Sequence, residues 1–446
     1  MILWCHMGNA KRNNRKFYFS KSKGRKIEAS FSGGDITSDA GSLLLREADK
    51  SMKLTEQLAP LIPDARHPLY ITHSMKTMLK QRLYGLALGY EDLNDHNTLR
   101  RDIALQTATD NSKKLASSST LCRLENTTDR KTAVEMSQLL VEFFIQSHKN
   151  PPEELILDFD ATDDLTHGNQ EKGAYHGYYG HECFLPLYVT CGHHVLVSYL
   201  RPSSSDQALH AWPILSLLVK RLRQVWPNVR IVFRADAGFC RHRIFNWCER
   251  NKVSYVVGIG GNARLKNLAK SLIADAKNCF EATQIKQRLF TDFNYKAGSW
   301  SQERRIILKA EHTDKGSNPR FVITNLMDDP QTVYDSHYCL RGDMENRIKE
   351  QQLDLFADRT SAHAWWTNQF RLLLSTFAYC LINYIRITAL AGTVLARAQC
   401  GTIRLKLFKI GAVVLMNTRR IQFLLSSSYP AQDFFIRIAN KLLCPG

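Results

Sequence analysis

The chain has 446 residues, of which 60 are Lys or Arg and 42 are Asp or Glu, so its formal net charge is +18. Hydrophobic residues make up 44% and aromatic residues 10% of the sequence, which excludes a disordered chain and allows roughly three domains. Length, composition and charge therefore predict a folded, basic protein whose partner is a polyanion.

Neither a membrane span nor export is indicated. The longest apolar run, Leu372–Ile385, lies between Arg371 and Arg386 and is shorter than the roughly 20 residues that a span needs. The opening MILWC is too short for a signal peptide. The 11 cysteines include no Cys-x-x-Cys pair, which is typical of a reducing compartment. We therefore expect a cytoplasmic protein with no membrane partner.

The positive charge is concentrated at the two ends of the chain. Residues 1–27 hold eight basic and no acidic residues, and residues 401–446 hold seven basic and one acidic residue. The central residues 151–260 are balanced, with 11 of each sign. We expect a flexible basic arm at 1–27 and a basic C-terminal segment at 401–446 that includes a hairpin, both contacting phosphates.

Residues 28–150 are predicted to form a helical domain, because apolar residues recur there at helical spacing. Its place next to the basic arm makes it the candidate DNA-binding domain. The serines of LASSSTLCRLEN can cap a helix that carries Arg123. This segment predicts either the entry to a helix-turn-helix, with Arg123 contacting DNA, or an ordinary capped helix of a bundle.

Five short strand-like runs follow Pro151-Pro152, and they read ELILDFD, FLPLYVT, HVLVSYL, VRIVFRAD and VSYVVGIG. The first three are closely linked and the last two are separated by helical patterns, so we predict an α/β fold with a mixed five-stranded sheet and flanking helices. We assign this core to residues 151–261 and 336–400, interrupted by a β-rich insertion at 262–335 before the last catalytic helix. A long apolar helix near residues 363–390 should be buried.

Acidic residues end two of these runs. Asp158 and Asp160 share one face of ELILDFD, and Asp236 ends VRIVFRAD. If the two strands are neighbours, their terminal aspartates lie side by side. Glu345 belongs to a later predicted helix, whose same face carries Tyr338, Arg341, Lys349 and Gln352. Three carboxylates suit a pair of Mg²⁺ or Mn²⁺ ions acting on a phosphodiester.

Several blocks together resemble a known family. LDFDATDDLTHG, YHGYYGHECFLPLYVTCG, WPNVRIVFRADAGF, YVVGIGGNARL, RFVITNL and YCLRGDMENRIKE are similar to those of DDE transposases from bacterial insertion sequences, in the branch with a tyrosine-arginine-glutamate signature. The resemblance runs from about Phe31 to the end of the chain and includes GYEDLNDH and TLCRLEN.

The resemblance implies an RNase H-like catalytic core and a role for each matching residue. Asp160, Asp236 and Glu345 match the catalytic metal ligands, with Asp158 as an alternative to Asp160. Tyr338 and Arg341 match residues that contact DNA phosphate. Where the related pattern has a lysine, this chain has Gln352, so Lys349 can serve only as a substitute. The resemblance also implies a homodimer on paired DNA ends and target DNA as a partner.

Other residues allow competing interpretations. Trp300, next to Arg304 and Arg305, either stacks a base flipped out of a DNA end, as in related transposases, or packs in a core. The histidines and cysteines between His167 and His194 fit no zinc spacing. The glycines of GIGGN lack the rest of a dinucleotide fingerprint, so no small-molecule cofactor is expected.

These observations predict a transposase that binds the terminal inverted repeats of its insertion sequence and catalyses metal-dependent DNA cleavage and strand transfer. Two alternatives share the same residues. One is a domesticated, sequence-specific DNA-binding protein with vestigial acids, and the other is an RNase H-like nuclease without strand transfer.

Overall fold

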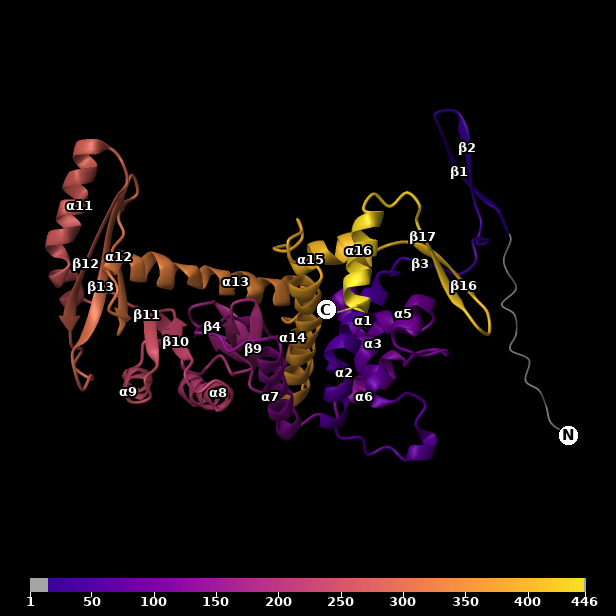
Figure 1. The fold of residues 1–446 in the computed structure, drawn as a ribbon, viewed down its shortest axis with the longest axis horizontal. Helices are drawn as coiled ribbons and strands as arrows, with labels where there is room; N and C mark the ends of the chain where they lie inside the picture. Colours follow the sequence, from indigo (N-terminus) through magenta and orange to yellow (C-terminus); the bar gives the residue numbers. More distant parts are fainter. Residues whose placement is uncertain (1–14, 445–446) are drawn as a thin grey trace.

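The computed structural model describes residues 15–444 and has an elongated outline (Figure 1). The first half of the predicted flexible arm, residues 1–14, lies outside the described residues. Its second half is not an irregular tail, because β1 (Phe17–Ser22) and β2 (Arg25–Ala29) pair as an antiparallel hairpin. This hairpin projects from the body at one end of the molecule (Figure 1).

The N-terminal region is helical, as its periodicity predicts. Its helices are α1 (Ser42–Met52), α2 (Leu54–Leu58), α3 (Met75–Leu88), α4 (His96–Leu99), α5 (Ile103–Ala108), α6 (Ser118–Glu125) and α7 (Arg130–Gln146). Ser117 stands at the predicted N-cap position of α6, but its side chain accepts no hydrogen bond from a backbone amide there, whereas Ser74 caps α3 by accepting one from the Thr77 amide.

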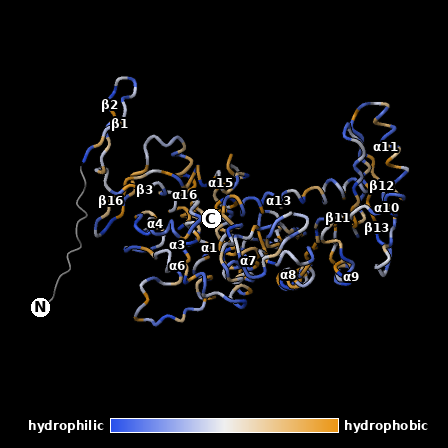
Figure 2. Tube along the Cα trace, turned by 180° about the vertical axis from the view of Figure 1, so that it is seen from behind, coloured by the Kyte–Doolittle hydropathy of each residue, from blue (hydrophilic) through white to orange (hydrophobic). Residues whose placement is uncertain are grey.

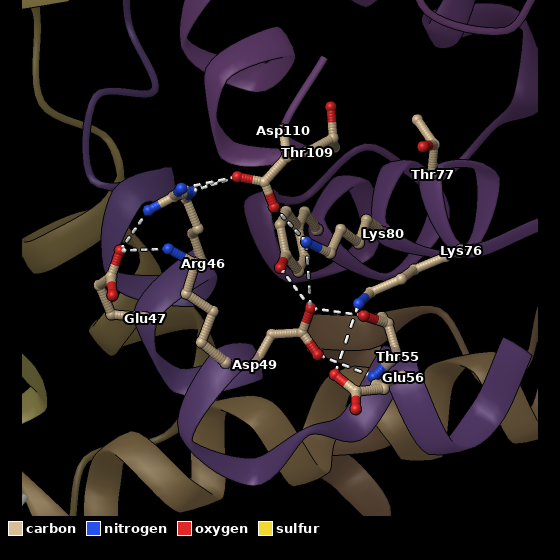
Figure 3. Close-up of polar contacts among 12 residues, drawn as sticks. Arg46, Glu47, Asp49, Thr55, Glu56, Lys76, Thr77, Lys80, Thr109 and Asp110 are labelled. Carbon is tan, nitrogen blue, oxygen red and sulfur yellow. Dashed lines mark hydrogen bonds and ion pairs between the residues drawn. The ribbon is translucent and has the colours of Figure 1, made fainter. Parts of the chain in front are cut away.

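A buried ionic network joins these helices (Figure 3). Lys80 of α3 is 4% exposed, and its Nζ lies 2.6 Å from Asp110 and 3.9 Å from Asp49. Asp49 also accepts hydrogen bonds from both the amide and the hydroxyl of Thr55, while Arg46 pairs with Asp110. Lys80 is therefore a structural cation between two acids and is not available to contact DNA.

The centre of the fold is one large mixed sheet. Its strands run in the order β12 (Gln287–Tyr295), β13 (Arg304–Thr313), β15 (Arg320–Thr324), β11 (Ser254–Ile259), β10 (Arg230–Ala235), β4 (Glu154–Ala161), β8 (Leu187–Cys191) and β9 (His194–Tyr199), with β14 (Gly316–Ser317) beside β13. The pairs β4·β8 and β8·β9 are antiparallel, and β10 is parallel to both β4 and β11. All five predicted runs are strands, and the prediction of a mixed sheet is confirmed.

The prediction of five strands is too low. The β-rich insertion does not form a sheet of its own, because β15 pairs with β11 and extends the main sheet to nine strands. The sequence does not show whether the edge of β11 stays open or pairs with a further strand, so this extension could not be predicted. A small separate sheet is made of β5 (Asp164–Leu165), β7 (His181–Phe184) and β6 (Ala174–His176).

Helices cover both faces of the large sheet. Helix α8 (Ala211–Val225) follows β9, α9 (His242–Arg250) follows β10, and α10 (Ala263–Leu268) and α11 (Lys270–Thr283) follow β11. Along α8 and α9 hydrophobic and hydrophilic residues are interspersed, as expected for amphipathic helices (Figure 2). A core cluster on this side includes Leu215, Phe245 and Phe233.

A long helical run crosses from the insertion strands to the middle of the molecule (Figure 1). It comprises α12 (Pro330–Thr332), the π-helix η5 (Val333–Tyr338), the 3-10 turn η6 (Cys339–Arg341), α13 (Gly342–Lys349) and the π-helix η7 (Glu350–Asp354). Val333 and Tyr334 pack against Val232 and Val256 of the sheet, and Met344 and Ile348 belong to the second major core.

That second core surrounds α14 (Trp365–Thr388), the predicted buried helix. By length and composition α14 could cross a membrane, but 78% of its most apolar window is buried inside the protein, as in a core helix. Glu125 of α6 is fully buried and pairs with Arg82 of α3 and Arg371 of α14. These two ion pairs of Glu125 link the N-terminal helices α3 and α6 to α14.

The C-terminal segment returns to the N-terminal region. It contains α15 (Cys400–Ile403), the π-helix η8 (Arg404–Phe408), the strands β16 (Ala412–Met416) and β17 (Ile421–Leu425), and α16 (Gln432–Leu443). The predicted hairpin is present, and β16 also pairs with β3 (Ile36–Thr37). The C-terminal hairpin therefore shares a three-stranded sheet with β3, which lies a few residues after the N-terminal hairpin.

Candidate active site

Two of the predicted acids stand at adjacent strand ends. Strands β4 and β10 are parallel neighbours, and their register pairs Phe159 with Ala235, so Asp160 and Asp236 follow on the same sheet edge. Asp160 Oδ1 accepts a hydrogen bond of 2.9 Å from the amide of Ala161. Asp236 accepts one of 2.9 Å from Gly238 and thereby caps the 3-10 turn η4 (Ala237–Phe239). The strand-end argument from sequence is confirmed for this pair.

The third acid comes from the helical run. Arg341 Nη1 lies 3.0 Å from Asp160 Oδ2, and Arg341 Nη2 lies 3.0 Å from Glu345 Oε1. The guanidinium therefore bridges an acid of β4 and an acid of α13. The side chain of Asp160 is 13% exposed and that of Glu345 is 48% exposed, so the cluster opens to solvent on its helix side.

The charges of this cluster act on one another. Burial is the largest cause that raises the pKa of Asp160, to about 6, and the charges of Asp236 and Glu345 raise it further while Arg341 lowers it. Burial opposes the charge of Arg341, yet the acids Asp160, Asp236 and Glu345 hold the pKa of its guanidinium above the ordinary value. The three acids are thus electrostatically coupled, and their mutual repulsion is partly offset by one arginine.

The donor chemistry of this cluster fits a hard divalent cation. Carboxylate oxygens are the ligands that Mg²⁺ and Mn²⁺ prefer, and a buried carboxylate beside two others has a charge that calls for a compensating cation. Among residues 15–444, however, no three His, Cys, Asp or Glu side chains are grouped closely enough to hold a metal ion. In this arrangement Arg341 supplies the positive charge.

Asp158, the alternative to Asp160, has a different partner. Its carboxylate is 4% exposed and forms a two-point ion pair with the guanidinium of Arg234, with one contact of 2.7 Å. Arg234 also donates a hydrogen bond to the carbonyl of His337, which ties the helical run to the sheet. Asp158 is committed to this buried pair, whereas Asp160 faces the other acids.

Tyr338 lies over the end of β11. A Cβ atom on Gly258 would meet the Tyr338 hydroxyl at 2.6 Å and the amide nitrogen of Ala237 at 3.0 Å, so only glycine leaves room there. Tyr338 ends a π-helix and Gln352 lies in another, so the predicted regular helical spacing holds only from Arg341 to Lys349. Irregular helical turns of this kind are frequent at functional sites.

The remaining residues of the predicted helix face differ from one another. Lys349 is exposed near the end of α13. Gln352, which stands where the related pattern has a lysine, donates a hydrogen bond of 3.0 Å to the carbonyl of Asp163. It therefore fixes the helical run to the chain just after β4.

Trp300 is buried, which favours the packing role over the stacking role. It is 7% exposed and packs against Phe245 and Tyr295, while the guanidinium of Arg304 lies 5.3 Å from its ring centre. Arg304 itself is 4% exposed and pairs with Glu249. Its neighbour Arg305 pairs with Asp292 on the adjacent strand. None of the three presents a free face to a DNA strand.

Arg123 is exposed on α6, and its guanidinium donates a hydrogen bond of 3.2 Å to Thr120. It lies in the helical region and not with the acids. Sequence reasoning missed the pairing of Asp158 with Arg234 and the hydrogen bond of 2.8 Å between Asp163 and His181. The arginine in FRAD on β10 could have indicated the pair of Asp158 with Arg234. No local sequence pattern indicates the contact of Asp163 with His181.

The sequence model of the family described as "Transposase DDE domain group 1" matches residues 19–444, so the chain belongs to that family. The resemblance inferred from the sequence blocks is thereby confirmed at the level of a DDE transposase. No curated protein matches the chain.

Seven chains among solved structures match this protein. One belongs to a cryo-EM structure of the piggyBac transposase synaptic complex with hairpin DNA. It shares 11% sequence identity, with a TM-score of 0.44, over 83% of this chain and 79% of that chain.

Proposed function

We propose that this protein is a transposase that binds the terminal inverted repeats of its insertion sequence and catalyses metal-dependent DNA cleavage and strand transfer. The observation that carries the proposal is that Asp160 and Asp236 stand at adjacent strand ends of the central sheet while Arg341 joins Asp160 to Glu345. The strand order β9-β8-β4-β10-β11 supports the RNase H-like core that the sequence resemblance implies.

In this proposal Asp160, Asp236 and Glu345 are the residues that would hold two Mg²⁺ or Mn²⁺ ions. The chemistry that such ions supply is activation of the attacking oxygen and stabilisation of the leaving oxygen of a phosphodiester. Asp160 and Asp236 are held in place by backbone hydrogen bonds from Ala161 and Gly238, so the strand ends present their carboxylates in a fixed orientation. Glu345 is the more exposed acid and completes the site from the helix.

Arg341 has two successive roles in this proposal. Without cations it neutralises Asp160 and Glu345, which lowers the cost of holding three acids together. With Asp160 and Glu345 engaged as metal ligands, the Arg341 guanidinium would be available to hold a DNA phosphate, because guanidinium matches phosphate geometry. Tyr338, beside the Asp236 turn, positions the same strand of DNA.

DNA binding is assigned to the basic ends and the helical region. Exposed basic side chains on the hairpin include Lys21, Lys23, Arg25 and Lys26, and α6 exposes Arg123. Contacts to phosphates position a duplex without reading its sequence, so these groups supply general affinity. Because two transposon ends must be handled together, we propose a homodimer on paired ends.

The experiment combines cleavage and binding on the ends of the element that encodes the chain. We expect Glu345→Gln to abolish Mg²⁺-dependent cleavage while a gel shift shows normal end binding. Asp275→Asn is the matched control, because Asp275 is exposed on α11 away from the cluster. Binding without any cleavage by the wild-type protein would favour the domesticated DNA-binding protein. Cleavage without joining of the 3′ end to a second duplex would favour the nuclease.

A further inference from the structure

A tyrosine-rich hairpin stands next to the acidic cluster. Strands β6 and β7 are joined by the turn Gly177–Gly180, and β7 pairs with β5, which begins only a few residues after Asp160. Ser203 donates a hydrogen bond of 2.6 Å to the carbonyl of Ala174 and fixes the other side of the hairpin. The turn is therefore anchored on both strands and is not a free loop.

The turn presents one tyrosine to solvent and holds the next one underneath. Tyr178 is 87% exposed, whereas Tyr179 is half-buried. Their ring centres are 5.1 Å apart at 86°, an edge-to-face contact, and Tyr179 also lies against the ring of His176 at 4.9 Å. Tyr179 is thus a support, and Tyr178 offers a free aromatic face.

The supporting tyrosine connects the hairpin to the acidic cluster. The ring of Tyr179 stacks on that of His181, with ring centres 6.0 Å apart, and His181 forms a hydrogen bond of 2.8 Å with Asp163, three residues after Asp160. Burial is the main cause that raises the pKa of Tyr179 to about 12, and the charges of Asp163 and Asp160 raise it further. The pair of tyrosines therefore lies at the border of the acidic cluster.

The turn also leaves space around the exposed ring. A Cβ atom added to Gly177 or Gly180 would meet no atom within 4 Å, and Gly180 has a φ of +77°, which favours glycine. The turn that carries the two tyrosines is therefore open on its outer side. A flat group can approach Tyr178 without a steric barrier.

We propose that Tyr178, supported by Tyr179, is a stacking platform for an unpaired nucleotide next to the phosphodiester that Asp160, Asp236 and Glu345 address. The proposal rests on the proposed function and adds a nucleotide-binding site to it. Aromatic faces stack any base, so the platform tolerates different sequences. The net charge of +18 and the continuity with the acidic cluster favour a nucleic acid over an apolar protein surface. Trp300, the aromatic residue expected in this role, is buried.

The test uses the full-length protein in EDTA, so that no DNA is cut. The probe is a duplex with a three-nucleotide single-stranded overhang that carries 2-aminopurine at its first unpaired position, and the fully paired duplex is the reference. Stacking on Tyr178 quenches the fluorescence. We expect Tyr178→Ala to lose the quenching and to bind the overhang duplex about 5- to 150-fold more weakly, with unchanged binding of the paired duplex.

Two further variants make the result specific. Tyr178→Phe keeps the ring and should behave like the wild type, and Tyr70→Ala removes a tyrosine that is 84% exposed in the loop between α2 and α3. Equal losses on both duplexes, or a Phe variant as weak as the Ala variant, would overturn the platform. Because Tyr178 is so exposed, an unchanged melting temperature should accompany each variant.

The outcomes separate this proposal from the proposed function. Tyr178-dependent quenching by a protein that does not cut DNA with Mg²⁺ would leave the platform standing and reject the transposase activity. Cutting of DNA ends with quenching that does not depend on Tyr178 would reject the platform alone.

Discussion

Asp164 offers a quantitative test of how the chain after β4 is packed. It is 2% exposed, Oδ2 accepts a hydrogen bond of 2.8 Å from Thr360, and Oδ1 has no hydrogen-bond partner. Burial is the largest cause that raises the pKa of Asp164 to about 8, with further contributions from the charges of Asp358 and Asp163, while Thr360 opposes them. In the folded protein at pH 7 this carboxyl is therefore mostly protonated.

The sign of the pH effect follows from the two pKa values. An unfolded chain releases this proton near pH 3.9, and the folded chain keeps it until about pH 8. Between these values folding takes up a proton, so the contribution of Asp164 to the free energy of unfolding falls by about 1.4 kcal/mol for each pH unit that the pH rises. Below pH 3.9 the contribution is constant, because both states are protonated.

Asp164→Asn replaces the acid by a neutral group of the same shape. The amide, like the protonated carboxyl, leaves one buried polar atom without a partner, so the two side chains should be nearly equivalent at pH 4. We expect the variant to become more stable than the wild type as pH rises, by about 3 kcal/mol between pH 5 and pH 7. Denaturant unfolding of both proteins across this range measures the difference. A constant difference at all pH values would show that Asp164 is ionised in the folded protein.

Three further substitutions test other parts of the structure. Lys80→Met should lower the free energy of unfolding by about 3 kcal/mol, because the buried Asp49 and the more exposed Asp110 lose the cation between them. A loss of DNA affinity in a fully stable variant would contradict this. Trp300→Ala should lower it by about 3–5 kcal/mol, and normal melting with defective end processing would return Trp300 to a DNA-binding role. Arg341→Gln should slow cleavage by about 100-fold at saturating Mg²⁺ with the fold retained, and an unchanged rate would remove Arg341 from the site.

Local patterns in the sequence predict much of the fold. The five strand runs, the buried helix α14 and the terminal hairpin β16–β17 all occur where alternation or helical periodicity indicates them. The pairing of Asp160 with Asp236 across neighbouring strands was also accessible, because both residues end a run and strand ends share a sheet edge.

What could not be predicted depends on contacts between distant segments. The strand pairing β11·β15 joins residues far apart in the chain and turns the expected insertion sheet into part of the main sheet. The burial of Trp300 depends on α9 and β12, which cover it from two sides. Whether an arginine is free to bind DNA also depends on acids that are distant in the sequence, as the pairing of Arg304 with Glu249 shows.

The transposase proposal rests most directly on the three acids, so the decisive measurement is cleavage and strand transfer on the element's own ends by Asp160→Asn, Asp236→Asn and Glu345→Gln. The account predicts that each variant binds the ends as tightly as the wild type, cuts them undetectably with Mg²⁺ or Mn²⁺, and melts at or above the wild-type temperature, because each removes a negative charge from a repelling cluster. Cleavage at a wild-type rate by Asp160→Asn would contradict it, because Asp160 stands at the centre of the cluster.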